Sequence, residues 1–421
     1  MKAEDKERLR ELAKKAAEIA ADPVQEQKRK MWIAMNDLQP VRPLVYARDY
    51  YYYLLDYKDE MKATIEDPFL KEIEETLLLR IYEWNHLRVD RVTEPFIECP
   101  VVFTDSGFGL GGYQPVKRSV DREYFKKAIV WEKDIKTPDD VEKIKDPIVE
   151  YDEKTTMERL NLLKEIFHDI IPVKLFGRSN FGCMPMDDIV AWMGIDEAMI
   201  AMADEPEFMH ALLDRYMGAH ISRIKQYEKL GILSSNNYKD IGNNCPGYTS
   251  QLPLPTESGI GAKIADIWGD SQDQIMTSVS PAMTNEFSFE HEKVWARQFK
   301  MYSYGCCERL DNKLDLLTKA FPNLRQVSSS PYSNLDIAAE KLGSRYVINF
   351  KPNSNYLAGG RPRFDLLRDE IIHACKIAEK HNLNLVINMK TIVTLDNEPQ
   401  RLWQWCDMAM ELVSAHFGAV R

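Results

Sequence analysis

The stretch QFKMYSYGCCERLDN, residues 298–312, combines the pattern of a buried strand with the densest cluster of reactive side chains in the chain. Apolar and aromatic residues lead up to Tyr304, and a helical run follows over residues 310–320. The turn between them consists of Gly305, Cys306, Cys307 and Glu308. A strand end that feeds a helix is where parallel α/β folds place their chemistry. The stretch therefore predicts a strand whose carboxyl end carries functional side chains.

The two adjacent cysteines of this turn allow two interpretations. Disulfide geometry makes a bridge between neighbours difficult, and neighbours on an extended strand point to opposite faces. We therefore expect one of Cys306 and Cys307 to face the mouth of the sheet and the other to face the packing layer. Both could instead be small buried apolar groups, as most free cysteines are. Glu308 favours the functional interpretation, because a buried carboxylate needs a partner or a role.

Composition limits the classes of partner. The chain has 421 residues, a net charge of -11 and a pI near 5.4, which argues against nucleic acid as the main partner. Seven cysteines without a signal-like segment at the start indicate reduced thiols in the cytoplasm. No apolar stretch approaches the roughly 18 to 20 residues that span a membrane. We expect a soluble cytoplasmic protein with no nucleic-acid or membrane partner.

Hydrophobic periodicity predicts an α/β fold. A helical extension over residues 1–40 precedes a domain over residues 41–421. That domain contains eight strand-like runs, most of them separated by helical segments: 44–47, 95–103, 170–176, 232–233, 298–305, 324–330, 346–350 and 383–388. The simplest architecture is a (β/α)8 TIM barrel with long βα loops. A doubly wound open sheet is the alternative, but no glycine-rich nucleotide-binding signature follows any strand.

One segment of the domain lacks a strand pattern. Residues 239–275 are long, polar and rich in glycine and proline, so we expect a loop there. A loop of that length in a compact domain is usually functional.

In a barrel, the ends of the strands share one mouth, and polar and aromatic side chains gather there. None of the eight histidines falls at a predicted strand end, which argues against a Ser/His/Asp hydrolase or a histidine-rich zinc site. The aromatic residues could be ordinary packing or could form a pocket for a flat aromatic ligand. The candidate substrate-binding residues are Tyr46, Arg48, Phe103, Phe176, Asn180, Asn236 and Tyr304.

The reactive turn admits three chemical roles. Cys306, Cys307 and Glu308 could bind Zn²⁺ with a further ligand from across the mouth, such as Glu98 or Cys99. Glu308 could instead act as a general acid with a raised pKa. A covalent cysteine nucleophile is usually paired with a histidine, and none is placed to help.

The order of several segments resembles the uroporphyrinogen decarboxylase-like superfamily. The resemblance runs from about Gln25 to the end of the chain, and its weight comes from the order and spacing of moderately specific motifs. These motifs are PVRPLVYARDY (40–50), VKLFGRSNFG (173–182), ADEPEFMHALLDRY (203–216), SVSPAMTNEF (278–287), YSYGCCERLDNKLDLL (302–317) and RYVINFKPNSNYL (345–357). The resemblance implies a (β/α)8 fold. It also implies either decarboxylation of porphyrinogen acetates or methyl transfer involving a corrinoid cobalt.

Departures from the family's motifs select among these activities. The decarboxylases have two arginines around Gln-Ala-Gly on the first strand, whereas this chain has only Arg48 there. The thiol-methylating branch holds zinc with a His-x-Cys on strand five and a cysteine on the last strand. Here Cys306 matches the first cysteine, Tyr304 replaces the histidine, and the last strand ends Asn388-Met389-Lys390.

The resemblance therefore implies the O-demethylase type of corrinoid-dependent methyltransferase. Such an enzyme takes a methyl group from a small aromatic donor, an aryl methyl ether, and passes it to a corrinoid. The chain lacks an Asp-x-His-x-x-Gly segment, so the corrinoid (cobalamin) is expected on a separate corrinoid-binding protein. Glu308 and Cys307 are the expected catalytic residues, and a Zn²⁺, if bound, would take Cys306, Cys307, Glu308 and Glu98 as ligands.

Two alternatives remain open. The chain could be a decarboxylase-like lyase acting on an acidic aromatic substrate, or a tetrapyrrole or corrinoid binder without catalysis. The acidic end of strand five argues against the binder, because binding alone needs no ionisable cluster. Related barrels often form dimers, so a homodimer is one state that the resemblance allows.

Overall fold

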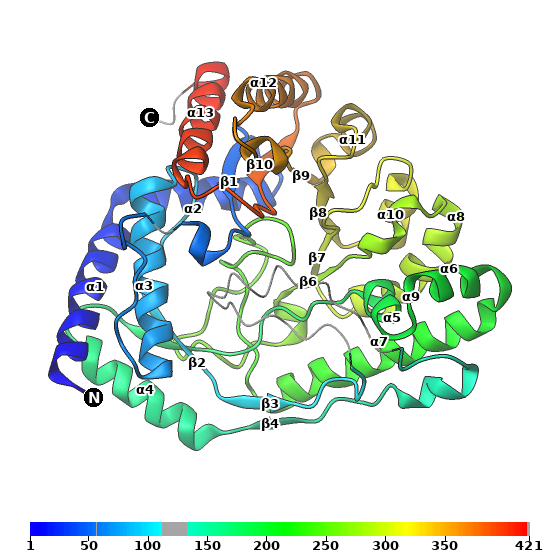
Figure 1. Cartoon of the computed structure of the whole chain (residues 1–421), viewed down its shortest axis with the longest axis horizontal. Coiled ribbons are helices and arrows are strands. Elements are labelled where there is room, and N and C mark those ends of the chain that lie inside the picture. Colours follow the sequence, from blue (N-terminus) through cyan, green and yellow to red (C-terminus); the bar gives the residue numbers. More distant parts are fainter. Residues whose placement is uncertain (56, 112–132, 419–421) are drawn as a thin grey trace.

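The computed structural model describes residues 1–55, 57–111 and 133–418 and has a mixed α/β fold (Figure 1). Helices surround a central group of strands. In the part of the chain that the structure describes, no helix is long and apolar enough to cross a membrane.

The central element is a six-stranded parallel sheet, in which every neighbouring pair runs in the same direction. Its strands, in spatial order, are β1 (Leu44–Ala47), β10 (Asn384–Met389), β9 (Val347–Phe350), β8 (Leu324–Ser329), β7 (Met301–Tyr304) and β6 (Trp268–Ser271). Most of their residues are buried on both faces, as expected for parallel strands between helices and an interior.

Two smaller sheets accompany it. β2 (Ile97–Pro100) pairs in parallel with β5 (Val173–Phe176), and β3 (Phe103–Asp105) pairs antiparallel with β4 (Val149–Tyr151). The helices of the outer layer are α3 (Pro68–His86), α4 (Glu153–Phe167), α5 (Pro185–Met193), α6 (Ile195–Asp204), α7 (Pro206–Lys229), α8 (Pro281–Thr284), α9 (Glu290–Ala296), α10 (Leu314–Ala320), α11 (Leu335–Leu342), α12 (Phe364–His381) and α13 (Gln400–Phe417).

The predicted N-terminal extension is helical. α1 (Ala3–Ala21) buries the predicted apolar face, including Leu9 and Leu12. Asp22 caps α2 (Pro23–Asn36), because its side chain accepts a hydrogen bond from the backbone N–H of Val24, and Pro23 occupies the first turn.

The structure departs from the expected strands in two places. β6 lies inside residues 239–275, which we expected to be loop, because its sequence Trp-Gly-Asp-Ser lacks a strand pattern. The expected strand at 232–233 makes only an isolated bridge, between Leu233 and Arg178. Asn236 extends this contact to β6, since its side-chain amide both accepts from Trp268 N–H (2.8 Å) and donates to Trp268 C=O (2.9 Å).

These links place β5 and β6 near each other without a continuous ladder. On the other side, the backbone N–H of Asp90 donates to Val45 of β1, just before the chain enters β2. Among the described residues the eight predicted strands do not form one uninterrupted hydrogen-bonded sheet. The parallel α/β architecture is present, and the closed barrel remains a prediction.

Candidate functional site

The reactive stretch lies at the edge where the parallel strands end, here called the carboxyl edge. β7 ends at Tyr304, and residues 305–308, here called the thiol turn, follow it. Gly305 has a φ of 95°, and a Cβ there would lie 3.0 Å from Ser328 Cβ and 3.1 Å from Leu310 Cδ1. Glycine allows the chain to turn sharply at this point. The turn brings Cys306, Cys307 and Glu308 to the carboxyl edge.

The two thiols lie side by side. Cys306 Sγ and Cys307 Sγ are 3.3 Å apart as free thiols, with Cys306 buried and Cys307 partly exposed. The expectation that they face opposite sides was wrong, because it assumed an extended strand through both residues. The turn at Gly305 ends the strand before them, so both sulfur atoms point into the same space.

Two buried lysines surround this thiol pair. Lys390, directly after β10, has its Nζ 3.3 Å from Cys306 Sγ and 3.1 Å from Asp49 Oδ2. Lys351, directly after β9, donates hydrogen bonds to Cys306 C=O at 2.6 Å and to Ser328 Oγ at 2.7 Å. Sequence reasoning assigned neither lysine a role in the site. Their ammonium groups place positive charge beside the two thiols.

This environment favours a thiolate at Cys307. A hydrogen bond from Cys306 lowers the pKa of Cys307 to about 6, with help from Lys351 and Lys390 and against the effect of burial. The same hydrogen bond, followed by burial, raises the pKa of Cys306. Burial lowers the pKa of Lys351 to about 8. The pair therefore holds one negative charge at neutral pH, on the more exposed sulfur atom.

Glu308 is a buried carboxyl group with a free oxygen atom. Its Oε2 accepts a hydrogen bond from the backbone N–H of Cys306 at 2.7 Å, and its Oε1 has no hydrogen-bond partner among the described residues. Burial, followed by the neighbouring Cys306, raises the pKa of Glu308 to about 7. A substantial fraction of the Glu308 carboxyl groups is protonated at neutral pH, as a general acid requires.

The loop inside residues 239–275 covers the inner face of the sheet. Asn244 is 1% exposed, donates to Ser303 Oγ of β7 at 2.7 Å, and accepts from Asn349 Nδ2 of β9 at 2.9 Å. Arg48, at the end of β1, donates to Asn244 C=O at 2.8 Å and lies 3.5 Å from Asp240 Oδ2. This part of the expected functional loop therefore supports the carboxyl edge from within.

The other predicted substrate-binding residues are dispersed. Tyr46 is buried edge-on against Trp32 and accepts a hydrogen bond from Arg91. Phe103 packs on Tyr227 of α7. Both rings pack against neighbours within the protein.

The remaining predicted substrate-binding residues, Phe176, Asn180, Asn236 and Tyr304, also lie in separate places. Lys239 Nζ lies 4.5 Å from the ring centroid of Phe176. Asn180 is exposed, and Asn236 is buried with its amide bound to Trp268 and Ser179. Tyr304 is buried against Phe289 and Phe321, on the helix side of β7. This geometry favours structural roles for Asn236 and Tyr304.

The four predicted zinc ligands are not gathered at one point. Glu98 on β2 accepts hydrogen bonds from Tyr238 and Lys239, at 2.7 and 2.6 Å. Within residues 1–55, 57–111 and 133–418 there is no group of three or more His, Cys, Asp or Glu side chains that could hold a metal ion. The cation beside Cys306 is the ammonium group of Lys390 instead. The donor set does not fit a zinc ion, so we place none in the site.

A second buried polar cluster lies behind β7. Glu292 of α9 accepts hydrogen bonds from Ser271, Ser288 and Tyr304. Burial raises the pKa of Glu292 and of the neighbouring Asp273. Sequence reasoning missed this cluster, because its members lie on separate elements without a shared motif.

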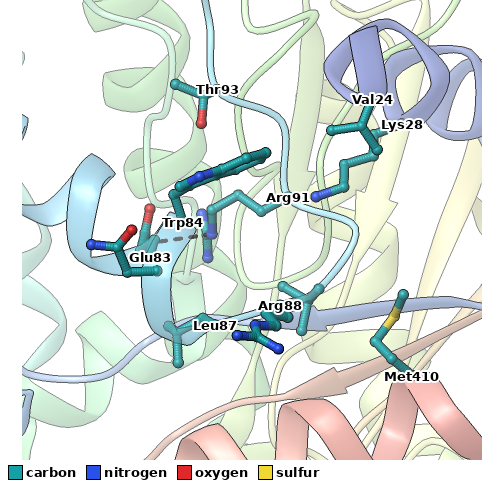
Figure 2. Close-up of a pocket in the computed structure, with 11 residues that line it drawn as sticks. Val24, Lys28, Glu83, Trp84, Leu87, Arg88, Arg91, Thr93 and Met410 are labelled. Atoms are coloured by element: carbon teal, nitrogen blue, oxygen red, sulfur yellow. Dashed lines mark ion pairs between the residues drawn. The ribbon is translucent and has the colours of Figure 1, made fainter. Parts of the chain in front are cut away.

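The structure also contains a cavity of about 450 Å³ away from the thiol turn. Figure 2 shows it between α2, α3 and the segment after α3, with Lys28, Trp84 and Arg91 among its lining residues. Arg91 is paired there with Glu83. No residue of the thiol turn lines this cavity.

Comparisons with known proteins give distant structural likenesses without a matching family model. No protein-family model matches the sequence. No curated protein matches it either. A solved structure of a methyltransferase from Methanosarcina mazei aligns with a TM-score of 0.43 and 11% identity, over 90% of this chain and 98% of that one. A likeness at this level carries no argument about function.

Proposed function

We propose that this chain is a methyltransferase that moves a methyl group from an aryl methyl ether to the cobalt of a corrinoid carried by a separate protein. The observation that carries the proposal is the thiol turn. It combines a carboxyl group with a pKa of about 7, a thiol with a pKa of about 6 and two buried lysines at the carboxyl edge. The family resemblance of the sequence adds the reaction class.

The reaction needs help at the oxygen atom. The reduced corrinoid, a substrate here, supplies the electron pair that forms the new bond to the methyl carbon. The methyl–oxygen bond breaks, its electrons stay on the phenolate oxygen, and that oxygen then takes up a proton. A positioned general acid contributes about 10² to 10⁴ in rate to such a step.

The residues of the thiol turn are suited to that task. Glu308 can hold the proton at neutral pH, while Lys351 and Lys390 supply positive charge for the developing phenolate. Cys307 is the partly exposed member of the turn and would contact the donor. Glu308 Oε1 is buried, so we infer that the donor or a small movement of the turn opens a path to it.

The first test mixes the purified protein with chemically reduced cobalamin and a panel of methoxylated aromatics and methylamines. Methylcobalamin, followed by its absorption spectrum, is the expected product with the aromatic ethers. If no compound of the panel gives methylcobalamin, the proposal is contradicted.

A variant pair assigns the acid. Glu308→Gln should lower the rate of methyl transfer by about 10² to 10⁴, because the amide cannot donate a carboxyl proton. Glu257→Gln removes an exposed carboxylate outside the thiol turn and should leave the rate of methyl transfer unchanged. Full activity in Glu308→Gln would show that another group protonates the oxygen.

A decarboxylase-like lyase is the second candidate. Lys351, Lys390 and Arg48 place several cationic groups at the carboxyl edge, which suits a substrate with carboxylates. This candidate predicts CO₂ release from an acidic aromatic or porphyrinogen substrate, with no requirement for a corrinoid.

A further inference from the structure

Arg178 is held firmly at the carboxyl edge by its backbone. It follows the end of β5, donates its N–H to Ile232 C=O at 2.9 Å, and accepts from Ser234 N–H at 2.9 Å. A Cβ on the preceding Gly177 would lie 1.9 Å from Ile232 O, so the two segments meet closely here. The starting point of the Arg178 side chain is therefore well defined.

The guanidinium group of Arg178 has no partner in the part of the chain that the structure describes. It takes part in no hydrogen bond or ion pair there, and its Nε is buried and unsatisfied. Burial, followed by the positive charge of Arg223, lowers the pKa of Arg178. The Arg178 side chain is partly exposed, so a ligand can reach its guanidinium group, and a guanidinium group without an acidic partner suits an anionic group of a ligand.

The nearest carboxylates do not fill this role. Asp105 accepts hydrogen bonds from Arg223 Nε at 2.6 Å and from the Tyr227 hydroxyl, both on its Oδ2, while its Oδ1 accepts from Gly107 N–H. Asp270 of β6 forms no ion pair with Arg178, and burial raises the pKa of Asp270 to about 6. Arg178 therefore remains available.

Other arginines of this region have acidic partners in the structure. The pairs are Arg42 with Asp90, Arg48 with Asp240, Arg91 with Glu83 and Arg223 with Asp105. Arg178 differs from them in having no acidic partner among the described residues.

Arg178 shares its edge of the molecule with the thiol turn. Parallel strands end on the same side, and Asp270 of β6 lies within electrostatic range of both Arg178 and Arg48. From β6 a chain of hydrogen bonds continues through Gln272, Asn243 and Lys390 to Cys306. An anion at Arg178 would thus lie on the same edge as the proposed reaction.

We propose that Arg178 binds a carboxylate of the methyl donor, so that the preferred donor is an aryl methyl ether with a carboxylate on its ring. That the ligand is a methyl donor rests on the proposed function. The binding of an aromatic carboxylate at Arg178 can be tested without methyl transfer. A planar guanidinium group binds a carboxylate through two parallel hydrogen bonds, which gives both affinity and orientation.

The test compares two compounds of similar shape, 4-methoxybenzoate and the neutral 4-methylanisole, by isothermal titration calorimetry without any corrinoid. The wild-type protein should bind the acid more tightly. Arg178→Gln should weaken binding of the acid by about 10- to 100-fold and leave the neutral compound unchanged, since a hydrogen-bonded charge pair is lost. Arg178→Lys should restore part of the preference for 4-methoxybenzoate over 4-methylanisole, because lysine keeps the positive charge but lacks the two parallel N–H donors.

Arg361→Gln is the matched control, since Arg361 is an exposed arginine and its loss should leave both titrations unchanged. Thermal melting separates a structural role from binding. Arg178→Gln should melt at the same temperature as the wild type or higher without ligand, and 4-methoxybenzoate should raise the melting temperature of the wild type only.

Either of two results overturns the inference. One is a wild-type protein that binds the acid no better than 4-methylanisole. The other is an Arg178→Gln variant that melts lower and keeps the preference, because Arg178 would then balance a carboxylate of the chain itself. Intact carboxylate binding without methyl transfer would overturn the proposed function and leave this inference standing.

Discussion

At the scale of single residues, the thiol pair decides the chemistry of the site. Cys306 donates to Cys307, and Lys351 and Lys390 stabilise the resulting negative charge. A pKa of about 6 means that Cys307 is mostly thiolate above pH 6 and mostly thiol below it. Iodoacetamide should therefore alkylate Cys307 with a rate that reaches half its maximum near pH 6, well below the ordinary cysteine value of about 8.5. Mass spectrometry of the modified peptide measures this rate.

Variants of the neighbouring residues test the cause. Cys306→Ala removes the donated hydrogen bond and should shift the half-maximal rate toward higher pH. Cys375→Ala, on α12, removes a distant buried thiol and should leave the profile unchanged. A wild-type profile that rises only around pH 8.5 would contradict the assignment.

Glu308 gives a second residue-scale prediction, on stability. Its pKa is about 7 in the folded protein, against an ordinary value near 4.5. Between these values the unfolded chain has lost the proton that the folded protein still holds, so stability falls as pH rises from about 4.5 to 7 and this loss is complete above pH 7. Glu308→Gln removes this loss and should be more stable than the wild type at pH 8, by on the order of 1 to 3 kcal/mol.

Urea unfolding at pH 5 and pH 8 measures the effect. The difference between wild type and Glu308→Gln isolates Glu308 from the other buried acids, since these are common to both proteins. Glu257→Gln should have the same free energy of unfolding as the wild type at pH 5 and at pH 8. An equal stability difference at pH 5 and pH 8 would show that Glu308 does not titrate in this range.

Sequence reasoning reached the residues of the thiol turn but not their surroundings. Cys306, Cys307 and Glu308 are adjacent, so the pattern alone indicated them. Lys351 and Lys390 lie 45 and 84 residues from Cys306 along the chain, and only the pairing of β7 through β10 brings them together. Their side chains also look like ordinary surface lysines in a sequence.

At the scale of elements, the buried loop is what the sequence described least well. Residues 239–249 have the composition of an exposed loop, yet Asn244 is buried against the inner face of the sheet. β6 was missed for a related reason: side chains such as Asn236 satisfy its backbone in place of a neighbouring strand. Where polar side chains replace the backbone hydrogen bonds of a neighbouring strand, the sequence has no hydrophobic pattern that indicates a strand.

Asn244→Ala tests the role of that loop. Asn244 binds Ser303, Asn349 and the β7 end, so its loss leaves buried polar groups unsatisfied and should reduce the free energy of unfolding by about 1 to 3 kcal/mol. Asn355→Ala, at an exposed position, should change it little. Chemical denaturation followed by far-UV circular dichroism measures both. Equal stability in the two variants would mean that the loop does not support the carboxyl edge.

At the scale of the whole molecule, alternating strand and helix patterns predicted a parallel α/β fold with an outer helical layer, and the structure has both. Whether the strands close into a barrel depends on pairings between short, irregular segments such as 232–236, which no periodicity specifies. The side chains of α2 enter the interior: Trp32 donates to Asp90 C=O, and Asn36 donates to Pro246 and Tyr248 C=O.

This packing predicts that the extension and the sheet unfold together. Trp32 is fully buried, so Trp32→Ala should reduce the free energy of unfolding of the whole chain by about 3 to 5 kcal/mol. Lys30→Ala, on the exposed side of the same helix, should change it by less than about 0.5 kcal/mol.

Urea unfolding should show one transition in both variants, with coincident curves from circular dichroism and tyrosine fluorescence. An early transition that shifts in Trp32→Ala while the main one stays in place would identify residues 1–40 as an independent unit. A single shifted transition makes α2 part of the core that holds β1, and with it the carboxyl edge, in position.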